Sequence, residues 1–225
     1  MIIAIDGPSG AGKSTVSKAV AQRLGFASLD TGAMYRAVAW RALQDGVSLD
    51  DGAALGAVAR THEIAFAVPK GPGLPQRVSI GSADVTDAIR TAAIDRAVSS
   101  VSSHPEVREA LTRQQQRIGR SGNYVVEGRD IGTVVFPDAE VKVFLTASDE
   151  ERARRRVEQN RQRGIGSIDL AEVLEDLKQR DDRDSSRSAA PLRAAGDALI
   201  VDSSEMPADE VVDQICAMAQ GAAAC

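Results

Sequence analysis

A glycine-rich segment directly after the first apolar run constrains this chain more than any other feature. Gly7-Pro8-Ser9-Gly10-Ala11-Gly12-Lys13-Ser14 matches G-x-x-x-x-G-K-[ST] and lies between a predicted strand and a predicted helix. Glycines let the backbone curl so that successive amides point inward, and the helix N-terminus adds positive potential where phosphates would lie. We therefore expect the loop, with Thr15, to bind the phosphates of ATP. Lys13 would reach the outer phosphates, and the Ser14 hydroxyl would be a ligand of Mg²⁺.

Five short, nearly continuous apolar runs predict the strands of one sheet. They are Ile2–Ile5, Ala27–Leu29, Tyr124–Val126, Val141–Leu145 and Ala198–Val201. Such runs are typical of parallel strands covered on both faces, and the helical periods between them supply the crossovers. The prediction is an α/β fold with a five-stranded parallel core flanked by helices.

Short local patterns predict where several helices begin and end. Gly25 follows a helical period and is a natural C-terminal stop, while Pro105 suits a first helical position. Ser148 with Glu151, and Asp169 with Glu172, form capping-box patterns that start two later helices.

Two segments depart from the alternation of strand and helix. Glu63–Val68 and Arg77–Ile80 predict strands around the turn sequence KGPGLP, so residues 61–90 are expected to form a small antiparallel insert. Between 150 and 166, arginines crowd a helix that ends in GIG: Arg152, Arg154, Arg155, Arg156, Arg161 and Arg163. Arg152 and Arg156 share a helical face, and we expect both to act on phosphates. A solvated charged face is the alternative for each.

Composition excludes several classes of protein. The 225 residues are 43% hydrophobic and 26% charged, as in ordinary globular proteins, and no apolar run approaches a membrane span. A net charge of −5 argues against bulk nucleic-acid binding. The first residues carry no export signal, and two cysteines near the C-terminus provide neither a disulfide framework nor a metal site. We expect a cytoplasmic monomer without a nucleic-acid or membrane partner.

Two further motifs follow the ends of predicted strands. LDTGAMYR ends in Arg36, and EGRDIG contains Arg129. Because α/β sheets bind ligands at the carboxyl ends of their strands, these arginines are expected near the glycine loop, where planar donors can hold an acceptor phosphate. Taken singly, Asp30 has the alternative of capping a helix and Arg36 that of a solvated residue. No N-K-x-D segment occurs, which argues against a guanine-specific switch.

With these residues in view, the chain resembles the bacterial cytidylate kinases. The likeness lies in GPSGAGKST, LDTGAMYR, EGRDIGTVVFPDA and RDDRDSSRSAAPL, which occur in that family's order. It implies a nucleoside monophosphate kinase of the P-loop NTPase fold, with its core at 1–60, 91–149 and 167–225. It also implies an acceptor-binding insert at 61–90, a mobile lid at 150–166, and phosphoryl transfer from ATP to CMP or dCMP.

The resemblance also implies roles for individual residues. Around the acceptor nucleotide and its phosphate it places Thr31, Tyr35, Arg36, Arg129 and Arg187. Cytosine would be read by Ser99, Arg108 and Asp130, and the sugar would lie near Arg180 and Asp184. Ser100 and Ser102 are close neighbours of Ser99 in AVSSVSS and are the alternatives for its role.

These residue types suit phosphoryl transfer to a monophosphate. The nucleophile is a phosphate oxygen whose second pKa is about 6, so it needs no general base. Bringing two polyanions together instead requires cations, and the expected catalytic set is Lys13, Arg129, Arg187, Arg152 and Arg156. Arg108 would donate to the cytosine acceptors and Asp130 would accept from its amine, whereas uracil presents a carbonyl there.

Two other functions stay open at this stage. The acceptor could be UMP, AMP or a small hydroxyl metabolite, with Asp30 as the base that a hydroxyl would need. A non-catalytic nucleotide-binding regulator is the alternative from another class, although a cationic lid is unnecessary for that role.

Overall fold

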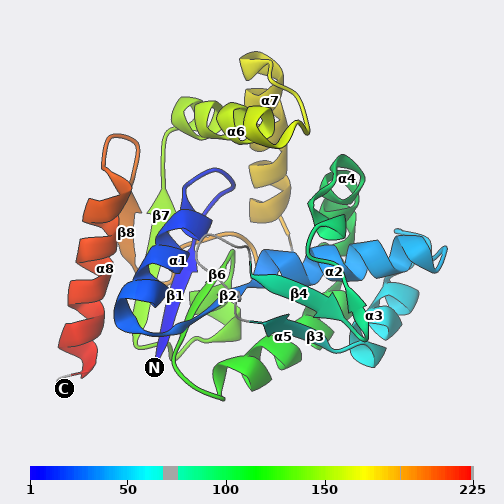
Figure 1. Ribbon diagram of the computed structural model, residues 1–225, viewed down its shortest axis with the longest axis horizontal. Helices are drawn as coiled ribbons and strands as arrows, with labels where there is room; N and C mark the ends of the chain where they lie inside the picture. The colour runs from blue at the N-terminus through cyan, green and yellow to red at the C-terminus, as the bar shows by residue number, and fades with distance from the viewer. Residues whose placement is uncertain (68–75, 188, 224–225) are drawn as a thin grey trace. The chain divides into compact units, whose positions relative to one another are not determined.

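The structure is a computed structural model in which residues 1–67, 76–187 and 189–223 are described (Figure 1). The chain divides into two compact units. The first unit comprises Met1–Asp30 and Gly119–Cys225, and the second comprises Thr31–Ile118. Each unit is described by itself below.

The first unit is built on the predicted five-stranded parallel sheet. Its strands, in the order β2-β6-β1-β7-β8, are Ala27–Asp30, Tyr124–Gly128, Ile2–Asp6, Val141–Thr146 and Leu199–Asp202. All four pairings are parallel, which confirms the expected α/β core. Register brings the strand ends together: Asp6 lies beside Gly128 of β6 and Phe144 of β7, and Asp30 lies beside Glu127. Polar residues at these ends therefore share one sheet edge.

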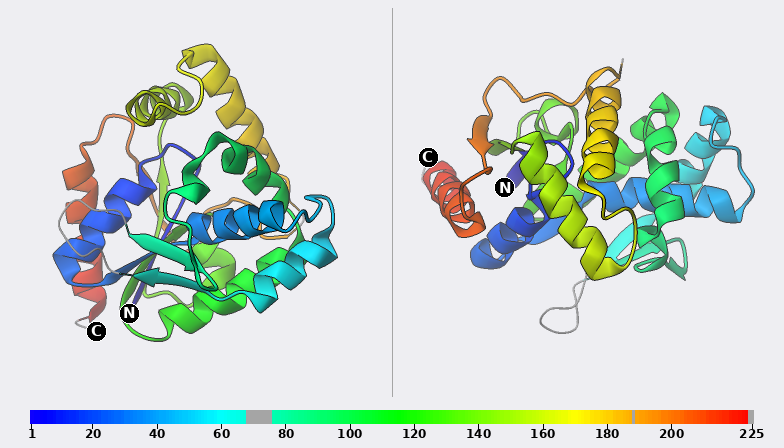
Figure 2. Two further views of the ribbon diagram at one scale, coloured as in Figure 1. Left: turned by 45° about the vertical axis from the view of Figure 1, so that its right-hand side comes forward. Right: turned by 90° about the horizontal axis from the view of Figure 1, so that it is seen from above.

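Apolar packing fixes the helices on this sheet. α1 (Lys13–Leu24) and α8 (Ala208–Ala223) pack side by side, and their buried Val16, Val20 and Ile215 join the residues of β1 and β7 in one core cluster. α6 (Asp149–Arg163) and α7 (Leu170–Ser185) form a separate pair of helices, which Figure 2 shows. The pair has its own small apolar cluster. A short π-helix, η2 (Ile131–Val135), follows β6.

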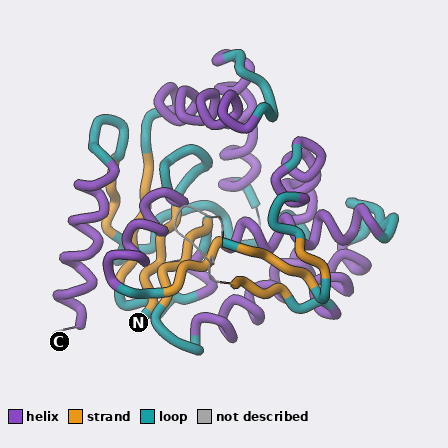
Figure 3. Tube along the Cα trace, in the orientation of Figure 1, coloured by secondary structure: helices purple, strands orange, loops and turns teal. Residues whose placement is uncertain are grey.

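The second unit contains the predicted antiparallel sheet, drawn with the other strands in Figure 3. Its strands are β3 (Ile64–Ala67), β4 (Arg77–Ile80) and β5 (Ala83–Asp84). The sequence did not predict β5, because two residues are too few for a period. Val68 and the KGPGLP turn lie outside the described residues. The helical elements are α2 (Thr31–Gln44), α3 (Gly52–Thr61), η1 (Ala88–Arg90), α4 (Ala92–Val101) and α5 (Pro105–Gly119).

The predicted helix ends are confirmed. Gly25 ends α1 in the left-handed conformation, at φ 69°, and Pro105 begins α5. Ser148 Oγ accepts from Glu151 N at 3.3 Å, and Asp169 Oδ1 accepts from Glu172 N at 2.9 Å. Within the described ranges, no helix has the length and apolar character needed to cross a membrane.

Candidate active site

The glycine loop joins β1 to α1 in the first unit, as its sequence predicts. Gly7, Gly10 and Gly12 have φ values of 146°, 82° and 91°, which L side chains rarely adopt. A Cβ on Gly7 would lie 1.9 Å from Leu145 O, so a side chain is excluded there on steric grounds as well. The glycines are therefore required by both conformation and close packing.

Lys13 is buried inside this loop. Its Nζ donates to Gly7 O at 2.7 Å and to Pro8 O at 2.6 Å, and only 7% of the residue is exposed. Burial and, secondly, the charge of Arg129 hold the pKa of Lys13 well below its ordinary value. Lys13 and Arg129 are thus close enough to repel each other, and the charges of Glu127 and Asp6 oppose that effect. An anionic phosphate bound here would compensate the two cations further.

Ser14 faces a buried carboxylate across the sheet edge. Its Oγ donates to Glu127 Oε2 at 2.7 Å, and Glu127 is 4% exposed at the end of β6. Burial, followed by the charge of Asp30, raises the pKa of Glu127 to about 7. The local donors are all oxygens, the ligand type that Mg²⁺ prefers. Sequence reasoning did not single out Glu127, although its place at the end of the third predicted strand was a usable signal.

A second buried carboxylate lies at the end of β1. Asp6 Oδ1 accepts from Ile131 N and Asp6 Oδ2 from Gly132 N, both at 2.8 Å. Burial raises the pKa of Asp6 to about 6 against the lowering effect of these two bonds. The segment that it binds follows Asp130, which is 5% exposed and was predicted to read the acceptor base.

Three of the predicted acceptor residues form one ionic cluster in the first unit. Arg129 Nε donates to Asp184 Oδ2 at 3.0 Å, and Arg187 donates to Asp184 Oδ1. Asp184 is buried and thus fixes two guanidinium groups from different segments. Arg180 lies one turn before Asp184 on α7, and its charge is close enough to lower the pKa of Lys13.

The arginines of α6 have different contacts. Arg152 is buried, and its Nη1 donates to Ser9 O of the glycine loop at 3.0 Å and also to Asp181 of α7. Arg156 Nη1 donates to Gln159 Oε1 on its own helix at 2.9 Å. Arg155, which the sequence places among the crowded arginines but to which we assigned no role, donates to Ser203 O at 2.6 Å and to Ser203 Oγ at 3.0 Å. Helical spacing alone could not separate these neighbours.

The other predicted acceptor residues lie in the second unit. Thr31 and Tyr35 are buried in the first turns of α2, and Arg108 lies with its guanidinium 5.5 Å from the centre of the Tyr35 ring. Arg36 Nη2 forms an ion pair of 2.5 Å with Asp95 Oδ1 of α4. Ser99 lies one turn after Asp95 on that helix. Asp95 carried no sequence signal, since its partner comes from another helix.

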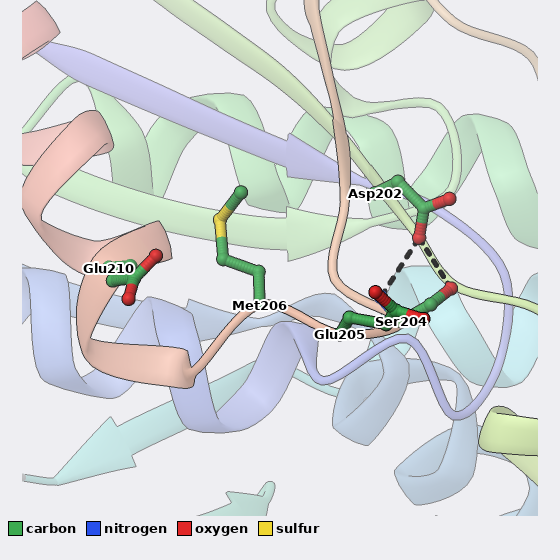
Figure 4. A pocket seen from close by; sticks show the side chains of 5 residues that line it. All are labelled: Asp202, Ser204, Glu205, Met206 and Glu210. Atoms are coloured by element: carbon green, nitrogen blue, oxygen red, sulfur yellow. Dashed lines mark hydrogen bonds between the residues drawn. The ribbon is translucent and has the colours of Figure 1, made fainter.

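Figure 4 shows an open pocket in the first unit, between the end of β8 and α8. It is lined by Asp202, Ser204, Glu205, Met206 and Glu210. Three of these five side chains are carboxylates. We therefore do not assign phosphate binding to it.

A buried lysine and an inward-curled glycine loop, on the edge of a five-stranded parallel sheet, define a P-loop phosphate-binding fold. A solved structure of an uncharacterized protein from Eubacterium ventriosum shares this fold, with a TM-score of 0.54, 14% identity and 98% coverage of both chains. The chain belongs to the cytidylate kinase family, whose model matches residues 3–221.

Curated relatives differ in length. A "Cytidylate kinase" from Shouchella clausii is 50% identical over 95% of this chain and 93% of its own length. A "Bifunctional pantoate ligase/cytidylate kinase" from Gloeobacter violaceus is 47% identical over 96% of this chain, but the match covers only 42% of that relative. The chain thus spans about two fifths of the length of the bifunctional relatives that it matches.

Proposed function

We propose that this chain transfers the γ-phosphoryl group of ATP to CMP or dCMP, giving ADP and CDP or dCDP. The observation that carries this proposal is the cluster of cations at one sheet edge of the first unit. Lys13 lies in the glycine loop, Arg129 is near enough to lower its pKa, and Asp184 joins Arg129 to Arg187. Such a cluster suits two phosphate groups better than one. Membership of the cytidylate kinase family supports the same reaction.

The residues suit a reaction that depends on positioning and charge. The acceptor phosphate is its own nucleophile, so no side chain has to remove a proton. Lys13 would hold the donor phosphates, while Arg129, Arg187 and Arg36 would hold the acceptor phosphate. Arg152, already bonded to the loop carbonyl of Ser9, and Arg156 would add cations from residues 150–166, the segment we propose as a lid.

Mg²⁺ fits the oxygen donors beside the loop. Ser14 is the residue that we assign to it, and the buried Glu127 carboxylate holds the Ser14 hydroxyl in place. When bound, the ion would neutralise part of the charge on the outer phosphates of ATP. Thr15 and the remaining loop residues would bind those phosphates through backbone amides.

We propose that cytosine is read by Asp130, Arg108 and Ser99, with Arg180 and Asp184 near the sugar. Among the three neighbouring serines, Ser100 Oγ donates to Leu49 O at 3.0 Å and Ser102 Oγ to Ser99 O at 3.1 Å. These two hydroxyls are engaged by the backbone, which supports Ser99 as the ligand contact. We also propose residues 61–90 as an acceptor-binding insert and a monomeric, cytoplasmic enzyme.

An acceptor panel tests the proposal. ADP release would be measured with ATP, Mg²⁺ and, in turn, CMP, dCMP, UMP, AMP and a hydroxyl metabolite. The expected kcat/KM for CMP and dCMP exceeds that for UMP by about ten- to a hundredfold, because uracil places a carbonyl against Asp130. Equal values for UMP would remove the cytosine assignment. Tight ATP binding without transfer to any acceptor would instead indicate a regulator.

A further inference from the structure

Asp6 is a buried carboxylate to which the reaction above gives no role. It ends β1, the central strand, directly before Gly7, and it is 4% exposed. Each of its oxygens accepts one backbone bond, from Ile131 N and Gly132 N, at 2.8 Å. The side chain of the residue directly before the glycine loop is thus hydrogen-bonded to the segment after Asp130.

These two hydrogen bonds, which we call the Asp6 tie, serve as the N-terminal cap of η2. The residue at the N-cap position is Asp130, with φ −142° and ψ 25°, and its own side chain makes no capping bond. The first backbone N–H groups of a helix have no partner within the helix, so they need an outside acceptor. Asp6 provides it from a strand that precedes Ile131 by 125 residues.

The geometry accounts for an acid rather than an amide at position 6. Two donors reach two different oxygens, and a carboxylate offers two acceptors, whereas an asparagine offers one acceptor and one NH₂ group. The NH₂ group would face a backbone N–H, and one buried donor would lose its partner. Burial of the charge is unfavourable, since it raises the pKa of Asp6 to about 6. The carboxylate of Asp6 is therefore retained although burial disfavours its charged form, because the two backbone N–H groups need two acceptors.

Close packing makes the tied segment sensitive to small changes. A Cβ on Gly132 would lie 3.2 Å from Lys142 Cδ and 3.5 Å from Asp6 Oδ2. The Gly132 backbone therefore approaches the Lys142 side chain more closely than most residues allow, whereas its approach to Asp6 is an ordinary contact. Loss of the Asp6 bonds would remove two hydrogen bonds that fix Ile131 and Gly132 to β1 beyond the end of the β1–β6 pairing at Gly128.

We propose that Asp6 is a positioning residue for the acceptor nucleotide, because it fixes the Asp130–Gly132 backbone relative to the glycine loop. It touches neither substrate. It sets the distance between the residue that reads the acceptor base and the loop that holds the donor phosphates. This inference rests on the proposed function and adds to it a residue that couples the two nucleotide sites.

Asp6→Asn tests the role by separating acceptor from donor kinetics. The variant should raise KM for CMP roughly tenfold and lower the preference for CMP over UMP, while KM for ATP changes by less than about threefold. Asp138→Asn is the matched control, since it makes the same chemical change on an exposed residue after η2. A cap with a purely structural role would lower the melting temperature of Asp6→Asn without changing either acceptor parameter, and that result would overturn the proposal.

Amide hydrogen exchange on the wild-type protein decides the question if Asp6→Asn does not fold. By linkage, an acceptor that binds better when the tie is formed must stabilise the tie by the same factor. Saturating CMP should therefore slow exchange at Ile131 and Gly132 about tenfold beyond its effect at Val16 in the core of the same unit. Equal slowing at all three amides would contradict the proposal.

Activity assays on the wild-type protein and on Asp6→Asn distinguish a wrong function from a wrong role for Asp6. If wild-type protein transfers phosphate to no monophosphate, the proposed function is wrong. If wild-type protein is active and Asp6→Asn keeps its acceptor KM and its base preference, only the role of Asp6 is wrong.

Discussion

The glycine loop and the segment Arg129–Gly132 lie in the same unit, yet different kinds of contact hold them. The glycine loop is shaped mainly by contacts within itself: Lys13 bonds to Gly7 O and Pro8 O, and three glycines adopt positive φ. Two bonds from distant segments, Arg152 to Ser9 O and Ser203 to Ala11 O, add to these local contacts. The Arg129–Gly132 segment is held by Asp6 and Asp184, which are distant in sequence. Contacts within a short segment produce a motif that can be recognised in the sequence. Contacts between distant segments involve single acidic residues, which no motif distinguishes from the other acidic residues of the chain. The difference predicts which substitutions affect one nucleotide and which affect both.

The largest expected effect concerns the glycine loop. Lys13→Ala removes the cation of the loop, and kcat/KM for transfer to CMP should fall at least about a thousandfold. The melting temperature should change little, because a buried charge with a lowered pKa is removed together with its two bonds. Steady-state assays and thermal melts measure both quantities. Retention of more than a tenth of the wild-type activity would show that the loop does not act on the transferred group.

The second largest effect concerns the Arg129–Gly132 segment, which residues distant in sequence hold in place. Asp184→Asn weakens the anchor of Arg129 and Arg187 together, so kcat/KM for CMP should fall about a hundredfold while ATP affinity stays within threefold. Asp182→Asn, an exposed change on the same helix, is the control. An equal loss of ATP and CMP affinity would mean that the cluster does not belong to the acceptor side.

A smaller effect concerns pH and stability. Burial raises the pKa of Glu127 from 4.5 to about 7, so the folded state holds this proton more tightly than the unfolded chain does. Stability from this group is present at low pH and is lost as the pH rises from about 4.5 through 7. Glu127→Gln does not titrate, so its stability relative to wild type should increase over that range, by at most about 3 kcal/mol.

Urea unfolding at a series of pH values, in EDTA, measures this difference. Glu210→Gln, at an exposed position, should show no such trend. A difference between Glu127→Gln and wild type that is constant or shrinks with rising pH would contradict the account of Glu127.

The sequence predicted much of the fold because the relevant signals are local. Five apolar runs predicted the five strands, and Gly25, Ser148 and Asp169 predicted helix ends that the structure confirms. Strand β5 and the π-helix η2 were not predicted, because the first has two residues and the second depends on a cap from Asp6.

The candidate site was predicted only in part, because only some of its contacts leave local signals in the sequence. The motifs named Lys13, Ser14, Arg129 and Asp130, and the structure places these four in the first unit. The bond from Ser14 to Glu127 and the bonds from Ile131 and Gly132 to Asp6 depend on the strand register, which no local pattern contains. The roles of the individual residues toward the two nucleotides stay predictions.

Binding of a bisubstrate analogue, in which five phosphates join adenosine to cytidine, tests most directly whether one cationic edge holds both nucleotides. Joining the two ligands makes the second binding event intramolecular, so the analogue should bind at least about a hundredfold more tightly than ATP or CMP alone by calorimetry. Lys13→Ala should lose most of that gain, and a uridine-linked analogue should bind more weakly. If the cytidine analogue binds no more tightly than ATP alone, the two phosphate groups do not share the site, and the account is wrong.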